Sequence, residues 1–326
     1  MSKGSGDLLK DAGQFRRLIG KLMYLTLSRP DITYAVHRLS QFLSTPRLPH
    51  MQAATKILQY IKGTLGQGVF FPAQSDLQFK AYCDVDWVGC PDTRESLIGY
   101  CVFLGDALIS WRSKKQSVVS RSFVEVEYRS MANTSCEVTW LLYLLKDLHV
   151  LHSKPVLMYC DNQVALHIAT DLVFHERSKH IEANCHIVRN RILDGTIKTF
   201  HVTTKNQLAN IFTKALGVDT LLWLLRRLGI INIFAQTIEY PECVTEKEEL
   251  RALFLRVSVE NNERGLAHYS KVQAVLHVET LAQQSRPRPE VKSGCITQAS
   301  QVAWASRELM DLIEAVPFHK QFIHSW

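Results

Sequence analysis

The order of strand-like and helical stretches in the middle of this chain limits the folds that it can adopt. Three short runs rich in aromatic and β-branched residues come first, at Leu77–Cys83, Gly99–Leu104 and Ala107–Arg112. Turn residues such as Pro91-Asp92 and Gly105-Asp106 separate them. This spacing predicts a three-stranded antiparallel meander, because antiparallel neighbours need only short connections.

Helices and strands alternate after the meander. A long helix is predicted from about Ser122 to Leu148, and strands follow at 155–160 and 197–202, with helical stretches at 164–169, 176–193 and 206–216. Strands that are joined through helices favour parallel pairing. The chain is therefore predicted to form an α/β fold, a mixed five-stranded sheet flanked by helices.

Two regions lie outside this predicted sheet domain, which covers residues 75–230. Residues 14–66 have apolar residues mostly three and four apart, which predicts a small helical segment with no acid pair or glycine loop of its own. Residues 234–326 contain a linker-like break at Gln283–Pro289 and no recognisable site, so they remain an unassigned tail.

Composition narrows the class of protein. The chain has 326 residues, of which 46% are hydrophobic, so it can bury a sizeable core and is not a disordered protein. Its net charge of +7 favours an anionic partner such as nucleic acid, although such an excess is also common on ordinary surfaces. Eight scattered cysteines without a Cys-x-x-Cys pair predict free thiols in a reducing compartment. No apolar run approaches the roughly 20 residues that span a bilayer. We expect an intracellular protein, cytoplasmic or nuclear, with no membrane partner.

Acidic residues stand at strand ends and on the long helix. Asp84 and Asp86 follow the first strand run, and Asp161 directly follows the fourth. Glu127 lies three residues after Val124, within or beside the apolar stripe of the long helix. Each has an ordinary explanation when taken alone: an Asp caps the next turn or helix, and a Glu at the edge of a stripe reaches solvent.

Taken together, these acids predict a cation site. Catalytic groups collect at the carboxyl ends of strands in such a sheet, and Asp84, Glu127 and Asp161 are expected to converge there. Three neighbouring carboxylates would repel one another unless a cation neutralised them. Ligands that are all oxygen favour magnesium or manganese over zinc.

Seven separated blocks of the sequence resemble, in the same order, the carboxy-terminal part of a copia-type retrotransposon Pol polyprotein. The resemblance runs from about Gln14 to Ile230. Its lead-in helices resemble the segment that joins the reverse transcriptase to its ribonuclease H domain, and its predicted sheet resembles that ribonuclease H domain. The blocks are Phe15–Leu22 (FRRLIGKL), Leu27–Val36 (LSRPDITYAV), Tyr82–Trp87 (YCDVDW), Ser110–Gln116 (SWRSKKQ), Cys160–Gln163 (CDNQ), Lys179–Glu182 (KHIE) and Ile211–Leu216 (IFTKAL).

This resemblance implies a ribonuclease H-like fold that hydrolyses the RNA strand of an RNA/DNA hybrid. Two Mg²⁺ ions about 4 Å apart, or Mn²⁺ in their place, would act at the scissile phosphate. By position in the family pattern, Asp84 would bridge both ions, Glu127 and Asp161 would each hold one, and Asp86 would support them.

The resemblance also implies contacts with the hybrid. Four basic residues are expected to bind its phosphates, and the alternative for them is a solvated basic turn: Arg112, Lys114, Lys115 and Arg121. Trp87 and Trp111 are expected in the core rather than as stacking platforms. The matching region begins after the paired aspartates of a reverse transcriptase, so no polymerase site is expected.

The chain departs from the family pattern at Asn210. The family has an aspartate in the block that reads LANIFTK here, so Asn210 stands in the place of a fourth catalytic carboxylate. Its amide oxygen can bind a metal but carries no charge, and the second ion should bind more weakly. Glu95 also stands where the family tends to be basic. These departures predict impaired or absent cleavage.

The alternative is a non-catalytic relic of the fold that at most binds nucleic acid. An unrelated phosphotransferase is disfavoured because no phosphate-cradling glycine loop is visible.

Overall fold

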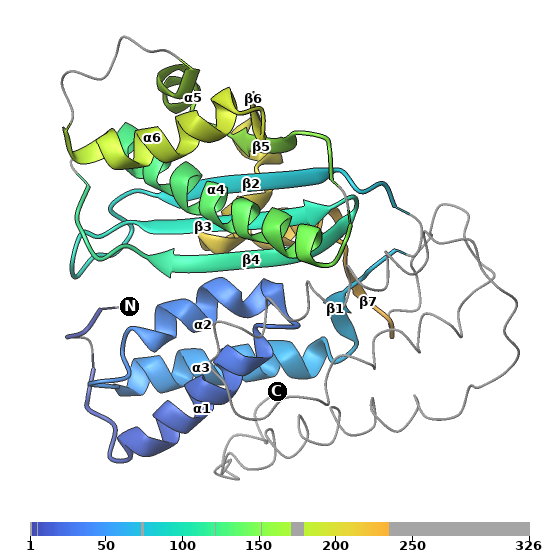
Figure 1. Ribbon diagram of the computed structural model, residues 1–326. Coiled ribbons are helices and arrows are strands. Elements are labelled where there is room, and N and C mark those ends of the chain that lie inside the picture. The colour runs from blue at the N-terminus through green and yellow to red at the C-terminus, as the bar shows by residue number, and fades with distance from the viewer. Residues whose placement is uncertain are drawn as a thin grey trace, which may run out of the picture.

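The computed structural model describes residues 2–4, 6–72, 75–120, 122–150, 152–170 and 179–234 (Figure 1). From residue 235 onward, the predicted tail lies outside these ranges. No helix within the described part of the chain is long and apolar enough to cross a membrane.

A mixed five-stranded sheet forms the centre of the fold, as predicted. Its strands are β2 (Phe79–Asp86), β3 (Leu97–Leu104), β4 (Ala107–Lys115), β5 (Val156–Cys160) and β6 (Ile197–His201). Their order across the sheet is β4-β3-β2-β5-β6. β2, β3 and β4 form the antiparallel meander, whereas β5 runs parallel to both β2 and β6. The meander strands extend further than predicted, so Asp84 and Asp86 belong to β2 itself.

Helices cover both faces of this sheet. The helices α4 (Phe123–Asp147), α5 (Gln163–Thr170) and α6 (Lys179–Leu193) lie on one face, and α4 packs across β2 and β3 (Figure 1). α4 begins where its N-cap residue Ser122 accepts a hydrogen bond from the N–H of Glu125 at 3.1 Å. The other face is covered by η4 (Leu208–Phe212) and α7 (Val218–Arg227), which form a second hydrophobic core with Cys101, Phe103 and Leu108.

The predicted helix over 206–216 is wrong. The segment instead forms two short 3-10 helices, η3 (Thr204–Asn206) and η4, before α7 begins. Gln207 lies between them and is fully buried, and its side chain accepts from the N–H of Ala209 and donates to the backbone oxygen of Cys83 at 2.9 Å. This contact with β2 interrupts the backbone hydrogen-bonding pattern of a regular α-helix. All five residues of η4 are buried.

The helical segment contains α1 (Ala12–Leu25), η1 (Pro30–Ile32), α2 (Thr33–Ser40) and α3 (Leu48–Gly63), which share a hydrophobic core of their own. A buried ion pair fixes η1: Arg29 donates to the carboxylate of Asp31 at 2.7 Å and to the backbone oxygen of Thr64 at 3.0 Å. A small sheet that the sequence did not indicate pairs β1 (Gln67–Val69) with β7 (Ile230–Asn232). It joins the end of the helical segment to the end of the sheet domain.

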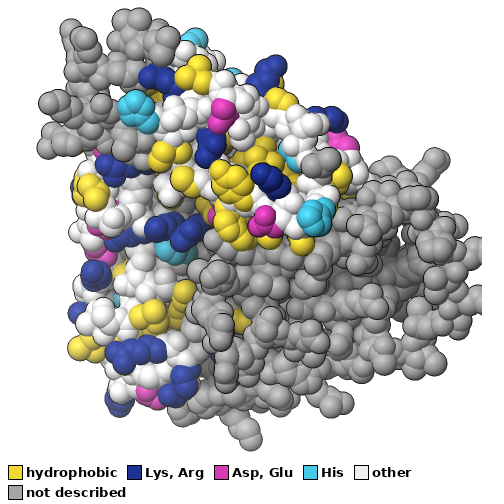
Figure 2. All heavy atoms as spheres, viewed as in Figure 1, with side chains coloured by type: hydrophobic (Ala, Val, Ile, Leu, Met, Phe, Trp, Pro, Cys, Tyr) yellow, Lys and Arg dark blue, Asp and Glu magenta, His cyan; other side chains and the backbone are white. Residues whose placement is uncertain are grey.

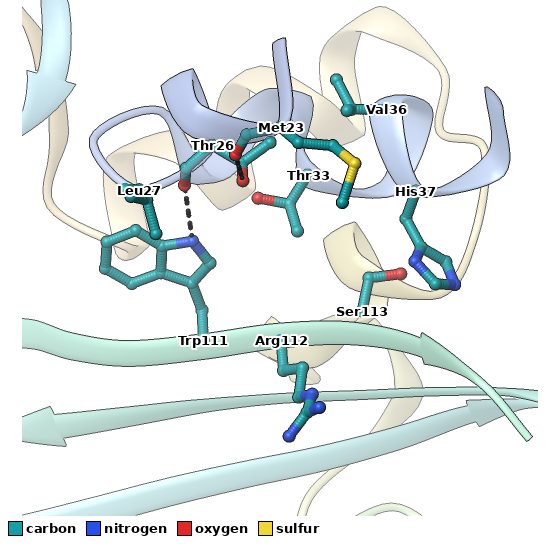
Figure 3. A pocket seen from close by; sticks show the side chains of 9 residues that line it. All are labelled: Met23, Thr26, Leu27, Thr33, Val36, His37, Trp111, Arg112 and Ser113. Atoms are coloured by element: carbon teal, nitrogen blue, oxygen red, sulfur yellow. Dashed lines mark hydrogen bonds between the residues drawn. The ribbon is translucent and has the colours of Figure 1, made fainter. Parts of the chain in front are cut away.

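The helical segment lies against β4, the edge strand of the main sheet. Trp111 donates a hydrogen bond from Nε1 to the backbone oxygen of Thr26 at 3.0 Å, and Nε2 of His37 accepts from the N–H of Lys115 at 2.9 Å. Between these two contacts is a cavity of about 170 Å³ (Figure 3). The two units are thus held together by packing and by hydrogen bonds to both backbones.

Candidate functional site

Asp84 is the most enclosed aspartate of the predicted site. It lies within β2 and pairs with Gly99 of β3, and only 1% of its surface is exposed. Its two carboxylate oxygens accept hydrogen bonds from different donors: Oδ2 from the hydroxyl of Thr213, and Oδ1 from Nζ of Lys214 at 3.1 Å. Burial raises the pKa of Asp84, and Lys214 opposes that shift. Both oxygens are therefore held by the protein.

Glu127 does not reach solvent, so the alternative of a stripe-edge residue is wrong. The side chain is fully buried on α4, and within the described part of the chain its Oε1 has no hydrogen-bond partner. Burial raises the pKa of Glu127 to about 10, with the charges of Cys160, Asp84 and Asp161 acting in the same direction. In the absence of a cation this carboxyl group therefore holds its proton at neutral pH.

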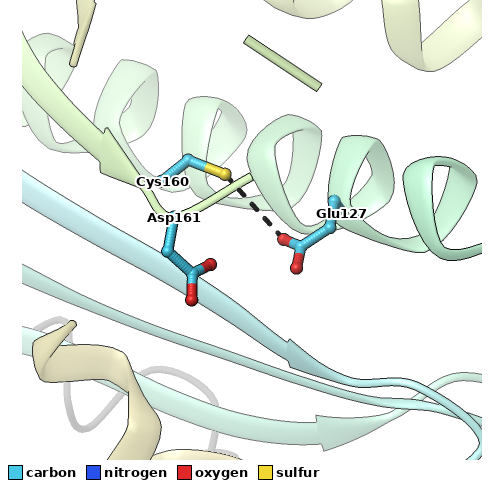
Figure 4. A group of neighbouring side chains, drawn as sticks. All are labelled: Glu127, Cys160 and Asp161. Carbon is cyan, nitrogen blue, oxygen red and sulfur yellow. Dashed lines mark hydrogen bonds between the residues drawn. The ribbon is translucent and has the colours of Figure 1, made fainter. Parts of the chain in front are cut away.

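Asp161 follows β5, and it does not cap the next helix. Asn162 takes that role, since its Oδ1 accepts from the N–H of Ala165 at 3.0 Å. The Asp161 carboxylate instead accepts from the hydroxyl of Thr204 at 3.0 Å and lies with Glu127 and Cys160 in a group whose potential ligand atoms are all within 4.8 Å of one another (Figure 4). The three predicted metal-binding acids thus lie in one region, between α4 and the ends of β2 and β5.

Asn210 lies beside Asp84, where the fourth carboxylate was expected. Its Oδ1 accepts a hydrogen bond from Nζ of Lys214 at 2.7 Å, and its Nδ2 donates to the backbone oxygen of Thr204 at 2.8 Å. Lys214 therefore bridges Asn210 and Asp84. Lys214 was not predicted as a site residue, although its position four residues after Asn210 in a block that matches the family is a signal that could have identified it.

Close packing at Gly99 brings η4 to Asp84. A Cβ atom at this position would lie 2.7 Å from Cγ2 of Thr213, 2.8 Å from Cβ of Phe212 and 3.3 Å from the backbone oxygen of Ala209. Only glycine fits at position 99, because the contacts that Cβ atoms make in proteins are longer than these distances. The η4 segment can therefore place Thr213 and Lys214 on the carboxylate of Asp84.

Asp86 occupies the end of β2 and supports the following turn. Its carboxylate folds over Gly89, where an added Cβ would overlap Oδ2. The side chain is partly buried, and burial raises its pKa. The supporting role expected for Asp86 stays a prediction.

The predicted phosphate-binding residues have different surroundings. Lys115 forms an ion pair with Glu95 at 2.6 Å, so its charge is partly neutralised. Lys114 and Arg112 are exposed, and Arg112 points to the face of β4 opposite Trp111 (Figure 3). Arg121 lies outside the described residues. Lys and Arg side chains are spread over the sheet domain and the helical segment on the face shown in Figure 2, so a role in phosphate binding stays a prediction.

The expectation for Trp87 is wrong, whereas Trp111 is partly buried and packs as predicted. Trp87 is 45% exposed, and it meets Phe123, which is 43% exposed, in an edge-to-face contact with ring centroids 6.2 Å apart. Trp87 follows the end of β2 directly, so no later strand residue covers it. Phe123 is one helical turn before Glu127, which puts this aromatic pair near the acidic group.

The residues present suit one cation better than two. Glu127 has an unsatisfied buried oxygen, and a cation near Asp161 would satisfy it. On the other side of the site, the ammonium of Lys214 already contacts Asp84 and Asn210. A second cation held by those two residues would have to displace it.

Comparison with known proteins gives matches over much of the chain. The retrovirus-related Pol polyprotein from transposon RE1 of Arabidopsis thaliana is 42% identical over 233 residues, which is 72% of this chain and 16% of that protein. The corresponding polyprotein from transposon TNT 1-94 of Nicotiana tabacum is 37% identical over 197 residues, or 60% of this chain and 15% of that protein. The chain therefore spans only about a sixth of the length of these relatives. No protein-family model matches it.

A solved structure, the N-terminal ribonuclease H domain of a Mycobacterium tuberculosis protein fused to maltose-binding protein, is 11% identical. The match covers 46% of this chain and 98% of that chain, with a TM-score of 0.31. The description of the fold above does not depend on this match. The family follows from the sequence relatives: the chain is homologous to a part of the retrovirus-related Pol polyproteins of copia-type transposons.

Proposed function

We propose that this chain is a retrotransposon-derived ribonuclease H that acts on the RNA strand of RNA/DNA hybrids, with cleavage impaired at Asn210. The observation that carries the proposal is the meeting of Asp84, Glu127 and Asp161, from two neighbouring strands and the facing helix. The charges of Asp84 and Asp161 both raise the pKa of Glu127, so all three act on one another electrostatically. Glu127 keeps its proton for this reason, and a cation bound among the three acids would offset the repulsion and let Glu127 ionise.

The residues of the chain would hold Mg²⁺, or Mn²⁺, through carboxylate oxygens. A bound pair of such ions would activate water and stabilise the leaving oxygen of the scissile phosphate. Glu127 and Asp161 would bind the first ion, and Glu127 would give up its proton on binding. Asp84 would bridge to the second position only after Lys214 had moved away.

Lys214 supports the proposal that activity is weakened rather than intact. In the family pattern an aspartate at position 210 would add a charge that attracts a second ion, whereas Asn210 adds none. Here Nζ of Lys214 lies 2.7 Å from Oδ1 of Asn210 and 3.1 Å from Oδ1 of Asp84. Its positive charge competes directly with a divalent ion for Asp84.

Binding of the hybrid would use charge and stacking beside the acids. Lys114 and Arg112 are exposed on the edge strand and would contact phosphates. Trp87 and Phe123 form an exposed pair, and Phe123 precedes Glu127 by one helical turn, so the pair would stack on a base or sugar of the hybrid. The Lys115–Glu95 ion pair weakens the phosphate contact that Lys115 was expected to make.

The test is a cleavage assay on a labelled RNA/DNA hybrid with Mg²⁺ and with Mn²⁺. We expect slow cleavage by the chain, a faster rate for Asn210→Asp, and no cleavage by Asp84→Asn. Equal and robust rates for the chain and Asn210→Asp would contradict impairment at this position. If neither cuts and hybrid binding persists in EDTA, the chain is a non-catalytic relic that binds nucleic acid, which is the second candidate function.

A further inference from the structure

A thiol lies among the acids of the site, where only oxygen ligands were expected. Sγ of Cys160 lies 3.9 Å from Oε2 of Glu127, and one potential ligand atom from each of Cys160, Glu127 and Asp161 lies within 4.8 Å of the other two (Figure 4). Asp84 does not belong to this group, because Thr213 and Lys214 hold its oxygens. The most closely placed set of ligand atoms therefore contains sulfur, which changes the cations that it suits.

Glu127 points into this group, with its Oε2 directed at Cys160 (Figure 4). The side chain is fully buried, and its other oxygen, Oε1, has no hydrogen-bond partner among the residues that the structure describes. An unpaired polar group in the interior is costly, and a cation at this point would satisfy it. In a tetrahedral site with bonds of about 2.3 Å to sulfur and about 2.0 Å to oxygen, the two ligand atoms lie about 3.5 Å apart. The observed 3.9 Å needs only a small adjustment of one side chain.

The sulfur atom is held in place by the strand that carries it. Cys160 is the last residue of β5 and pairs with His201 of β6, so its backbone is fixed by the sheet. The N–H of Asn162 points at Sγ from 3.4 Å. An N–H donor of this kind stabilises negative charge on sulfur and orients it as a ligand.

We propose that Glu127, Cys160 and Asp161 form a site for one thiophilic divalent cation such as Zn²⁺, Co²⁺ or Cd²⁺. On binding, the ion replaces the thiol proton of Cys160 and the carboxyl proton of Glu127, and both protons pass to solvent. The inference rests on the proposed function in so far as Glu127 and Asp161 belong to both sites. It predicts that a zinc-type ion competes with Mg²⁺ there, because Mg²⁺ gains little from a thiolate.

Co²⁺ titration of the reduced full-length chain, without nucleic acid, tests the site. Thiolate ligation gives an intense near-ultraviolet sulfur-to-cobalt absorption band that oxygen ligands do not give. We expect this band in the chain and in Cys136→Ser, which removes an exposed thiol elsewhere on α4. We expect no band in Cys160→Ser, and binding weakened by about tenfold or more in Glu127→Gln.

Absence of the band at saturating Co²⁺, or a band that survives in Cys160→Ser, would overturn the proposal. Circular dichroism shows whether Cys160→Ser folds. If it does not, the ¹¹³Cd chemical shift of the unmodified chain reports whether sulfur binds the ion. A chemical shift typical of oxygen ligands alone would overturn the proposal. The outcome is independent of cleavage. Sulfur ligation without any hybrid cleavage upholds this site and counts against the proposed function, whereas Mg²⁺-dependent cleavage without sulfur ligation does the reverse.

Discussion

His37 makes the contact between the helical segment and the sheet dependent on pH. Its Nε2 accepts a hydrogen bond from the backbone N–H of Lys115 at 2.9 Å, and an imidazolium has no lone pair to do so. Burial lowers the pKa of His37 from 6.5 to about 4, and the charges of Arg38, Arg112, Lys115 and Lys114 add to the shift. The folded chain therefore favours the neutral ring.

The size of the effect follows from the shift in pKa. Each unit corresponds to about 1.4 kcal/mol, so a change from 6.5 to about 4 corresponds to about 3 kcal/mol of the free energy of unfolding. Because the folded state has the lower pKa, this stabilisation is fully present above the unfolded value of 6.5 and is lost as the pH falls toward 4. Over that window the unfolded chain binds one proton more at this site than the folded chain does.

The perturbation is His37→Gln, which keeps a hydrogen-bond acceptor but does not titrate. Urea unfolding of both chains at neutral pH and at about pH 4 gives the two free energies of unfolding. We expect the chain to lose about 2 to 3 kcal/mol more than the variant between these conditions. Parallel losses would refute the reasoning, since every other titrating group is common to both proteins.

Three further changes test the packing that supports the site. Gly99→Ala should lower the free energy of unfolding by about 1 to 3 kcal/mol, because the new Cβ would lie 2.8 Å from Cβ of Phe212 in η4, and the urea midpoint measures this loss. Asp31→Asn should cost about 3 to 5 kcal/mol by leaving Arg29 buried without its charge partner; faster amide exchange in α1 and α3 than elsewhere would locate the effect. Trp111→Phe should cost about 1 kcal/mol through loss of the bond to Thr26, and an unchanged unfolding midpoint would show that this contact does not stabilise the interface.

Local patterns were enough to predict the sheet and the long helix. The runs that became β2, β3 and β4 have strand composition and short turns, and the apolar stripe that became α4 is long enough to exclude a strand. The positions of Asp84 and Asp161 then follow from strand order, and that of Glu127 follows from the packing of α4 on β2 and β3. Cys83, Cys90, Cys101 and Cys160 are buried and Cys136 is exposed, and free thiols in a reducing compartment stay a prediction.

The details that were missed depend on contacts between distant residues. η4 is not an α-helix because Gln207 bonds to β2, and no pattern within the segment indicates that partner. β1 and β7 are short strands from opposite ends of the described chain, so periodicity cannot reveal their pairing. Trp87 was expected in the core, but it lies just after the end of β2 and is exposed. The sequence could not decide whether Glu127 reaches solvent or whether Asp161 caps the next helix, because both depend on contacts between distant residues.

Restoring the missing carboxylate alone should not restore the site fully, because Lys214 would meet it first. Nζ of Lys214 lies 2.7 Å from Oδ1 of Asn210, so the new acid in Asn210→Asp would form an ion pair with the same ammonium that holds Asp84. Adding Lys214→Met leaves both carboxylates free for a cation. Calorimetric titration with Mn²⁺ should therefore give one bound ion for the chain and two for the double variant, with affinity at the second position rising at least about tenfold over Asn210→Asp alone. If the single and double variants bind Mn²⁺ alike, Lys214 moves aside without cost, and the missing charge at position 210 is by itself the reason for a weak second site.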